Sequence, residues 1–153
     1  MILYLDTSAA LRLLLEHPET GTLQFYLDEM SQHATIVSSV MIETELRRIA
    51  AEQGAPQILA TSILAGINLI DPVRSHFAMA GLLPVRGLRS LEALHLITAM
   101  RAEADVLVAY DRPLIEAAAS VGLASISHRL EGAGGSFQLR ADDGTSAVVR
   151  VPL

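Results

Sequence analysis

Two aspartates lie at the ends of predicted parallel strands, where such sheets usually bind ligands. Asp6 directly follows the apolar run 2–5, and Asp111 comes just after the apolar run 106–109. In an open parallel sheet, ligands bind beyond the carboxyl ends of the strands. Either aspartate alone is well explained as an N-cap, because its side chain can accept backbone N–H bonds at the start of the next helix. Capping does not require both acids at one rim, so the pair predicts an acidic site there.

Glu45 is a third acid, and it interrupts an apolar stripe. At the helical spacing i, i+3, i+4 and i+7 it shares that stripe with Ile42, Leu46 and Ile49. A carboxylate in a core-facing row is costly unless something positive meets it. The alternative is that Glu45 reaches the edge of the core and pairs with Arg48.

Glu92 is the fourth acid, in the first turn of a helix that Ser90 is predicted to cap. The helix dipole alone could account for an acid at this place. All four acids nevertheless approach one end of the same predicted sheet. A single metal-binding site accounts for them jointly, because hard cations such as Mg²⁺ and Mn²⁺ prefer oxygen ligands and relieve the repulsion between carboxylates.

The composition of the 153-residue chain excludes several other classes of protein. Hydrophobic residues make up 51% and charged residues 18%, which excludes a disordered chain. Cysteine and lysine are both absent, so a disulfide framework, a thiolate nucleophile, a Walker lysine and a Schiff base are excluded. The net charge of −6 argues against coating nucleic acid by bulk electrostatics, so any such contact must rely on a few arginines and metal ions.

Short apolar runs alternate with helical patterns along the chain. Strands are predicted at residues 2–5, 34–37, 67–70, 106–109 and 124–126. Helices are predicted at about 8–16, 20–31 and 39–52, after Pro56 through Leu64, from Pro72 to about 82, from 90 to about 104, and from Pro113. Continuous apolar strands separated by helices predict an α/β fold with a mainly parallel sheet of four to five strands, covered on both faces.

The two ends of the chain carry further signals. Residues 1–130 are predicted to form the domain, and 131–153 a Gly-rich tail in which 137–141 and 146–151 flank a turn and predict a β-hairpin. The apolar start is cut short by Asp6 and lacks a basic segment before it, which argues against a signal peptide. The longest uncharged stretch, 53–70, is broken by glycine and proline, so we expect no membrane span and a cytoplasmic protein.

The acids lie in segments that together resemble a known family. These segments are Leu5-Asp6-Thr7-Ser8-Ala9, Ser38-Ser39 through Glu45-Leu46, Leu91 through Leu96, and Tyr110-Asp111-Arg112-Pro113-Leu114. In their order and spacing, over about residues 1–128, the chain resembles the PIN-domain family and specifically the VapC-type toxin ribonucleases of type II toxin–antitoxin systems. The resemblance implies a three-layer α/β/α sandwich, and it places the family's acidic set on Asp6, Glu45, Glu92 and Asp111. Two positions depart from the family pattern: Glu92 is usually aspartate, and Ala109 stands where threonine or serine is frequent.

From the acids and the resemblance we expect metal-dependent hydrolysis of an RNA phosphodiester with Mg²⁺ or Mn²⁺ as cofactor. Asp6 and Asp111 are the expected main ligands, Glu92 a ligand directly or through water, and Glu45 either a ligand or the group that positions the water. The expected phosphate contacts are Arg12, Arg86, Arg89 and Arg112. Thr7, Ser8 and Ser39 are auxiliary candidates for contact with metal-bound water, with helix capping as their default role. His95 is predicted to be a packed helix residue and not a base.

The resemblance also implies partners: an RNA substrate, a cognate VapB-like antitoxin that blocks the acidic site, and a second copy of the chain in a homodimer. Apolar residues in excess of one helix stripe agree with a dimer, although burial in the monomer core explains them as well: Leu13, Leu14, Leu15, Leu23, Phe25 and Leu27.

Two alternatives stay open at this stage. One is a catalytically degenerate PIN domain that binds RNA or protein, with Glu92 and Ala109 as signs of decay. The other is a phosphotransferase with Asp6 as nucleophile. Such sites usually have a second aspartate beside the first and a lysine on a later strand, whereas position 8 is Ser8 and the chain has no lysine.

Overall fold

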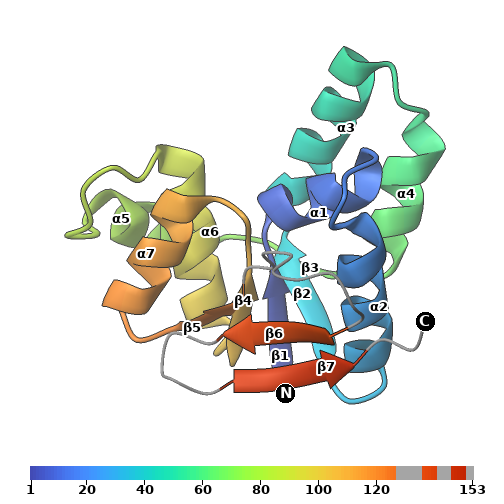
Figure 1. Ribbon diagram of the computed structural model, residues 1–153. Coiled ribbons are helices and arrows are strands. Elements are labelled where there is room, and N and C mark those ends of the chain that lie inside the picture. The colour runs from blue at the N-terminus through green and yellow to red at the C-terminus, as the bar shows by residue number, and fades with distance from the viewer. Residues whose placement is uncertain (127–135, 141–145, 151–153) are drawn as a thin grey trace.

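The computed structural model describes residues 1–126, 136–140 and 146–150. Five parallel strands form one sheet in the order β3-β2-β1-β4-β5, with helices on both faces (Figure 1). The strands are β1 (Ile2–Leu5), β2 (Thr35–Ser39), β3 (Asn68–Ile70), β4 (Val106–Val108) and β5 (Ala124–Ile126). The predicted three-layer α/β/α fold is therefore confirmed, with all five strands of this sheet parallel.

The helices divide between the two faces of the sheet. Four of them cover one face: α1 (Thr7–Leu14), α2 (Thr20–Ser31), α3 (Met41–Gln53) and α4 (Gln57–Ala65). The other face carries α5 (Arg74–Gly81), α6 (Ser90–Arg101) and α7 (Arg112–Ser120). None of the described helices is long and apolar enough to cross a membrane.

The central strand β1 shows why its sequence is apolar at every position. Successive side chains of a strand point to opposite faces. Leu3 and Leu5 pack into the core on the α1–α4 side, whereas Tyr4 packs into the core beneath α6 and α7. All three side chains are buried, so both faces of β1 are covered.

Several leucines that the sequence analysis found consistent with a dimer are buried in the core of the monomer. Leu14, Leu23 and Leu27 are buried in the cluster on the α1–α4 side. Their excess over one helix stripe follows from α1 and α2 packing on the sheet and on one another. These three residues therefore carry no argument for a dimer.

Several helix starts differ from the prediction by one or two residues. Ser39 was predicted to open a helix, but it ends strand β2, and α3 begins at Met41. The long helix α6 begins at Ser90 with Arg89 as its N-cap, because the Glu92 carboxylate accepts the Arg89 backbone N–H at 2.9 Å. Helix α5 begins at Arg74 and not at Pro72, because the intervening Val73 is extended, with φ −86° and ψ 165°. The predicted cap at Ser90 and the predicted helix start at Pro72 were therefore wrong by one and two residues.

The tail contains the predicted β-hairpin. Strands β6 (Ser136–Arg140) and β7 (Ser146–Arg150) pair antiparallel, with Ser136 opposite Arg150. The predicted glycine joint at 131–135 and the predicted turn at 142–145 lie outside the described residues.

Core packing predicts different stability effects for the substitution of a buried and an exposed leucine. Leu96 on α6 is fully buried, whereas Leu82 at the end of α5 is 82% exposed. We expect Leu96→Ala to lower the free energy of unfolding by about 2–5 kcal/mol, through lost apolar burial and the cavity left behind. Leu82→Ala should change it by less than about 0.5 kcal/mol. Urea unfolding of both variants measures this, and equal losses would contradict the described packing.

Candidate active site

A cavity of about 450 Å³ opens at the carboxyl ends of β1 and β4, and all four predicted acids line it. They reach it from four separate segments. Asp6 follows β1, Glu45 lies on α3, Glu92 lies in the first turn of α6, and Asp111 precedes α7. The topology thus brings together the acids that the sequence singled out.

Asp6 is held by the start of α1. Its Oδ2 accepts the Ser8 backbone N–H at 2.9 Å and also the Ser8 hydroxyl, so the predicted capping role is real. The residue is only 4% exposed. Burial raises the pKa of Asp6 above its usual range, and the hydrogen bonds from Ser8 offset part of that rise. An ionised Asp6 is therefore a destabilising group that a cation in the cavity would relieve.

Ser8 connects the first and last acids of the site. Its hydroxyl donates to Asp6, and its oxygen accepts the backbone N–H groups of Tyr110 at 2.9 Å and Asp111 at 3.2 Å. This hydroxyl fixes the loop after β4 against the start of α1. In this arrangement its proton is directed at Asp6, so its predicted contact with metal-bound water stays a prediction.

Asp111 combines capping with exposure to the cavity. Its Oδ1 accepts the Leu114 backbone N–H at 3.2 Å at the start of α7. Its Oδ2 lies 3.4 Å from the Arg89 guanidinium. The helix uses one oxygen of this carboxylate, and the other faces Arg89 across the cavity.

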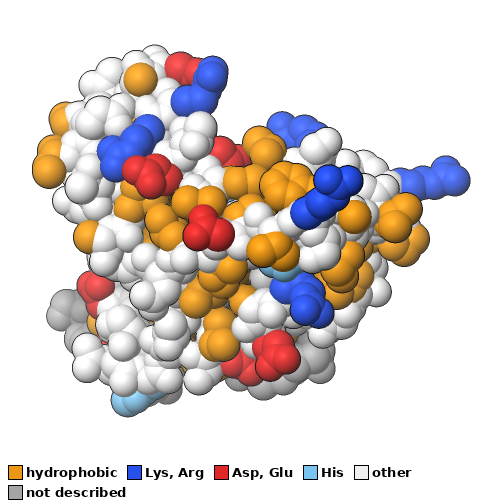
Figure 2. Space-filling view, turned by 180° about the vertical axis from the view of Figure 1, so that it is seen from behind, with side chains coloured by type: hydrophobic (Ala, Val, Ile, Leu, Met, Phe, Trp, Pro, Cys, Tyr) orange, Lys and Arg blue, Asp and Glu red, His pale blue; other side chains and the backbone are white. Residues whose placement is uncertain are grey.

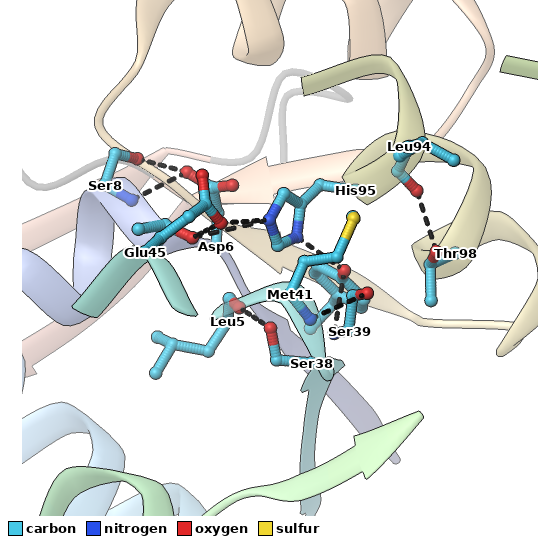
Figure 3. A network of polar contacts seen from close by, with 12 residues as sticks. Leu5, Asp6, Ser8, Ser38, Ser39, Met41, Glu45, Leu94, His95 and Thr98 are labelled. Atoms are coloured by element: carbon cyan, nitrogen blue, oxygen red, sulfur yellow. Dashed lines mark hydrogen bonds and ion pairs between the residues drawn. The ribbon is translucent and has the colours of Figure 1, made fainter. Parts of the chain in front are cut away.

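Glu45 is tied to two neighbours through one oxygen. Its Oε2 accepts the Thr7 hydroxyl at 2.7 Å and lies 2.9 Å from His95 Nε2 (Figure 3). Burial by itself raises the pKa of Glu45, but the hydrogen bonds from His95 and Thr7 outweigh it and hold this pKa below its usual value. The predicted alternative of a surface pair with Arg48 was wrong, because Arg48 pairs with Glu52 on the same helix at 3.1 Å.

His95 is a site residue that the sequence analysis missed. It is packed, as predicted, with 1% exposure, yet its ring lines the cavity and contacts Glu45. A signal was available: His95 lies three residues after Glu92 on α6, so the two share one helix face.

Arg89 supplies a cation to the acidic cavity from the chain itself. Both oxygens of Glu92 are engaged by this residue, Oε2 by its backbone N–H and Oε1 by its Nε at 2.6 Å. The same guanidinium reaches Asp111. Although its side chain is 80% exposed, it links two of the four acids.

The other predicted auxiliary and phosphate-binding residues lie away from the cavity. Arg12 lies 5.0 Å from the centre of the Tyr110 ring, and Arg112 pairs with Glu116 on its own helix at 2.6 Å. Arg86 is exposed on the loop before α6. Ser39 is buried, and its hydroxyl oxygen accepts the Met41 backbone N–H at 3.4 Å. Their predicted roles toward substrate or metal stay predictions.

The donor set fits a hard divalent cation. Asp6, Glu45 and Asp111 each have one oxygen held by the scaffold, which leaves a second oxygen to the cavity. Within the described residues, no three His, Asp or Glu side chains gather closely enough to hold a metal ion in the present arrangement. The Arg89 guanidinium stands in for a cation between Glu92 and Asp111, so cation binding by these two acids requires Arg89 to release them.

Comparison with known proteins defines the family. A family model for the PIN domain matches residues 3–120. This match covers most of the chain and contains all four acids. The chain therefore belongs to the PIN-domain family.

Relatives narrow this assignment. Ribonuclease VapC47 of Mycobacterium tuberculosis (strain CDC 1551 / Oshkosh) is 31% identical over 131 residues, covering 82% of this chain and 96% of the relative. Ribonuclease VapC46 of M. tuberculosis (strain H37Rv) is 34% identical over 129 residues with the same coverage. The likeness is to VapC-type PIN domains.

Solved structures share the fold. VapBC2 from Rickettsia felis, bound to a DNA fragment from its promoter, matches with a TM-score of 0.60 at 20% identity, covering 72% of this chain and 89% of that one. M. tuberculosis VapC20, a toxin that cleaves the sarcin–ricin loop, matches with a TM-score of 0.61 at 13% identity, covering 79% and 95%. At such identities the likeness speaks for the fold alone.

The buried charge of Asp6 predicts a stability difference. Because its pKa is raised in the folded state, its contribution to stability is present below about pH 4 and is lost as pH rises through the folded pKa. Asn also caps helices well. We therefore expect metal-free Asp6→Asn to melt a few degrees above wild type at pH 7, with the gap closing at low pH. Calorimetry from pH 3 to 8 measures this, and a less stable variant at pH 7 would contradict the pKa direction.

Proposed function

We propose that this protein is the toxin of a toxin–antitoxin module and a metal-dependent endoribonuclease. The supporting observation is that four carboxylates from four segments line one cavity in a chain whose curated relatives are named Ribonuclease VapC. Hydrolysis of an RNA phosphodiester in an acidic cavity needs a cation that offsets both the carboxylates and the phosphate. Mg²⁺ or Mn²⁺ is the proposed cofactor.

The four carboxylates have different roles in this proposal. Asp6 and Asp111 would hold the ion through the oxygens that their helices leave free, and Glu92 would join directly or through water. Bound there, a divalent ion supplies a Lewis acid and charge stabilisation for phosphodiester hydrolysis. Glu45, held at Oε2, presents Oε1 to orient the attacking water and accept its proton.

Arg89 is the proposed phosphate contact. Its guanidinium pairs with Glu92 and Asp111. If these two acids held a divalent ion instead, the guanidinium would be free for a bidentate contact with the RNA phosphate at the mouth of the cavity. This agrees with the surface in Figure 2, where basic side chains are scattered and do not form one patch. RNA would be held locally at the site and not by a broad basic face.

Partners follow from the same proposal. The R. felis neighbour is a VapBC2 pair, which supports a VapB-like antitoxin that blocks the acidic cavity of this chain. A homodimer is also proposed, supported by large apolar side chains left exposed on α5, namely Phe77 and Met79. Because the proposed substrate is RNA, the protein would act in the cytoplasm.

Two observations favour the alternative of a degenerate, RNA- or protein-binding PIN domain. Arg89 engages both oxygens of Glu92, and within the described residues no three acidic or histidine side chains lie close enough to hold a metal ion. Titration with Mn²⁺ separates the two functions, because a catalytic site must bind the ion and a degenerate one does not.

Removing either proposed principal ligand should abolish cleavage. We expect Asp6→Asn and Asp111→Asn to lower Mg²⁺- or Mn²⁺-dependent RNA cleavage by at least about 10²–10³-fold, since each removes a charged ligand of the cation. EDTA should have the same effect on the wild type. The measurement is mapping of new RNA 5′ ends after induced expression, followed by cleavage kinetics with the purified protein.

The matched control for these variants is Glu43→Gln. Glu43 pairs with Arg47 on the surface of α3 at 2.8 Å, outside the cavity, so its loss should leave cleavage unchanged. Cleavage that survives both Asp6→Asn and EDTA would rule out the proposed chemistry.

A separate prediction follows from the competition between the Arg89 guanidinium and a metal ion for the same carboxylates. Arg89→Gln should strengthen Mn²⁺ binding by the metal-free protein, by less than about tenfold because exposed ion pairs are weak. The same variant should raise KM for RNA because the phosphate contact is lost. Calorimetric titration measures the affinity, with Arg86→Gln as a control outside the cavity. Unchanged or weaker Mn²⁺ binding by Arg89→Gln would show that Arg89 does not compete with the ion.

A further inference from the structure

A chain of polar contacts runs from the sheet to Glu45 through the otherwise apolar core. The Ser39 backbone N–H lies 3.0 Å from the Tyr4 hydroxyl, and that hydroxyl lies 2.8 Å from His95 Nδ1. His95 Nε2 then lies 2.9 Å from Glu45 Oε2. Tyr4 and His95 are both essentially inaccessible to solvent. Figure 3 shows the His95 ring between the strand that carries Ser39 and the carboxylates of Glu45 and Asp6.

The donors and acceptors of this chain fix its direction. A backbone N–H can only donate, so the Tyr4 oxygen accepts from Ser39. An ionised carboxylate can only accept, so His95 Nε2 carries a hydrogen and donates to Glu45 Oε2. In the neutral imidazole Nδ1 then carries no hydrogen, so it accepts the proton of the Tyr4 hydroxyl. Thr7 Oγ1, 3.4 Å from Nε2, is a weaker second contact.

This direction determines how Glu45 presents its carboxylate. Its Oε2 receives two donors, from His95 and Thr7, whereas Oε1 has no hydrogen-bond partner within the described residues, and Glu45 lines the cavity. Ordering a glutamate side chain costs substantial rotamer entropy. The two hydrogen bonds to Oε2 offset this cost and hold the carboxylate in one orientation. The His95 ring is itself fixed, by the Tyr4 hydrogen bond and by an edge-to-face contact with the Tyr4 ring at 76° and 5.9 Å between centroids.

We propose that His95, held by Tyr4 in the Nε2–H form, is a positioning residue that aims Glu45 Oε1 at the reacting water. The proposal rests on the proposed ribonuclease function and deepens it by naming what orients Glu45. Any buried histidine needs hydrogen-bond partners for its ring nitrogens, and here the partner on Nε2 is a carboxylate that lines the cavity. Here both are satisfied, and one leads directly to the rim of the site.

Three variants test this role through kinetics. His95→Phe fills the space but cannot donate, and should lower kcat for Mn²⁺-dependent cleavage by about 10–100-fold with little change in KM, because Glu45 loses its aim. His95→Gln places an N–H donor near the position of Nε2 and should restore most of kcat. Tyr4→Phe leaves the ring unanchored and should lower kcat several-fold.

Thr98→Val is the matched control. Thr98 is a fully buried polar residue on the same helix, but its hydroxyl donates to the Leu94 carbonyl at 2.7 Å and leads away from the cavity. Its replacement should change thermal stability and leave kcat at the wild-type value. A fall in kcat as large as that of His95→Phe would show that any buried defect in α6 has this effect, and would overturn a specific role for His95.

A readout independent of cleavage is the tautomer of His95 in the metal-free protein. Long-range ¹H–¹⁵N NMR spectra should show a neutral ring with its hydrogen on Nε2, and Glu45→Gln should shift that resonance. A hydrogen on Nδ1, or wild-type kcat in His95→Phe, would overturn the positioning role. A wild type that cleaves no RNA would instead overturn the proposed function, whatever the tautomer.

Discussion

Carboxylates placed around one cavity repel each other and lose hydration, and this cost is the constraint that the site must satisfy. The fold meets it with neutral donors. Asp6 is held by Ser8, Asp111 by the start of α7, and Glu45 by Thr7 and His95, each through one oxygen. Because these donors bring no full charge, they orient the acids without cancelling them. Arg89 is the exception among the donors, since this charged residue engages both oxygens of Glu92 and also reaches Asp111.

The sheet register sets the spacing of the acids. Strand β1 pairs with β4 so that Leu5 lies opposite Val108, and the Asp6 backbone N–H continues the ladder to the Val108 carbonyl at 3.0 Å. The residues that follow these strands therefore begin side by side. Strand β2 flanks β1 on its other edge and leads into α3, which brings Glu45 to the same rim. Parallel pairing thus converts distant positions in the chain into neighbours.

Much of this arrangement could be predicted from the sequence because it follows from strand ends and helix periodicity. Asp6 and Asp111 mark the ends of two apolar runs, and Glu45 interrupts an apolar stripe. Sequence periodicity does not reveal which polar side chains form hydrogen bonds with each other across the core. The contact between His95 and Tyr4 joins residues 91 positions apart, and its hydrogen bonds depend on how α6 packs on the sheet. The engagement of Glu92 by Arg89 depends likewise on the local cap geometry, since Ser90 and not Arg89 has the usual capping chemistry.

The position of β1 at the centre of the sheet also determines when the cavity can exist during synthesis. Asp111 and the strand that aligns it are synthesised just over a hundred residues after Asp6. At about 5–20 residues per second, several seconds separate the two. Until β4 emerges, β1 lacks one neighbour and Ser8 lacks the loop that it anchors. A nascent chain therefore has no assembled acidic cavity until β4 and the residues that follow it have been synthesised.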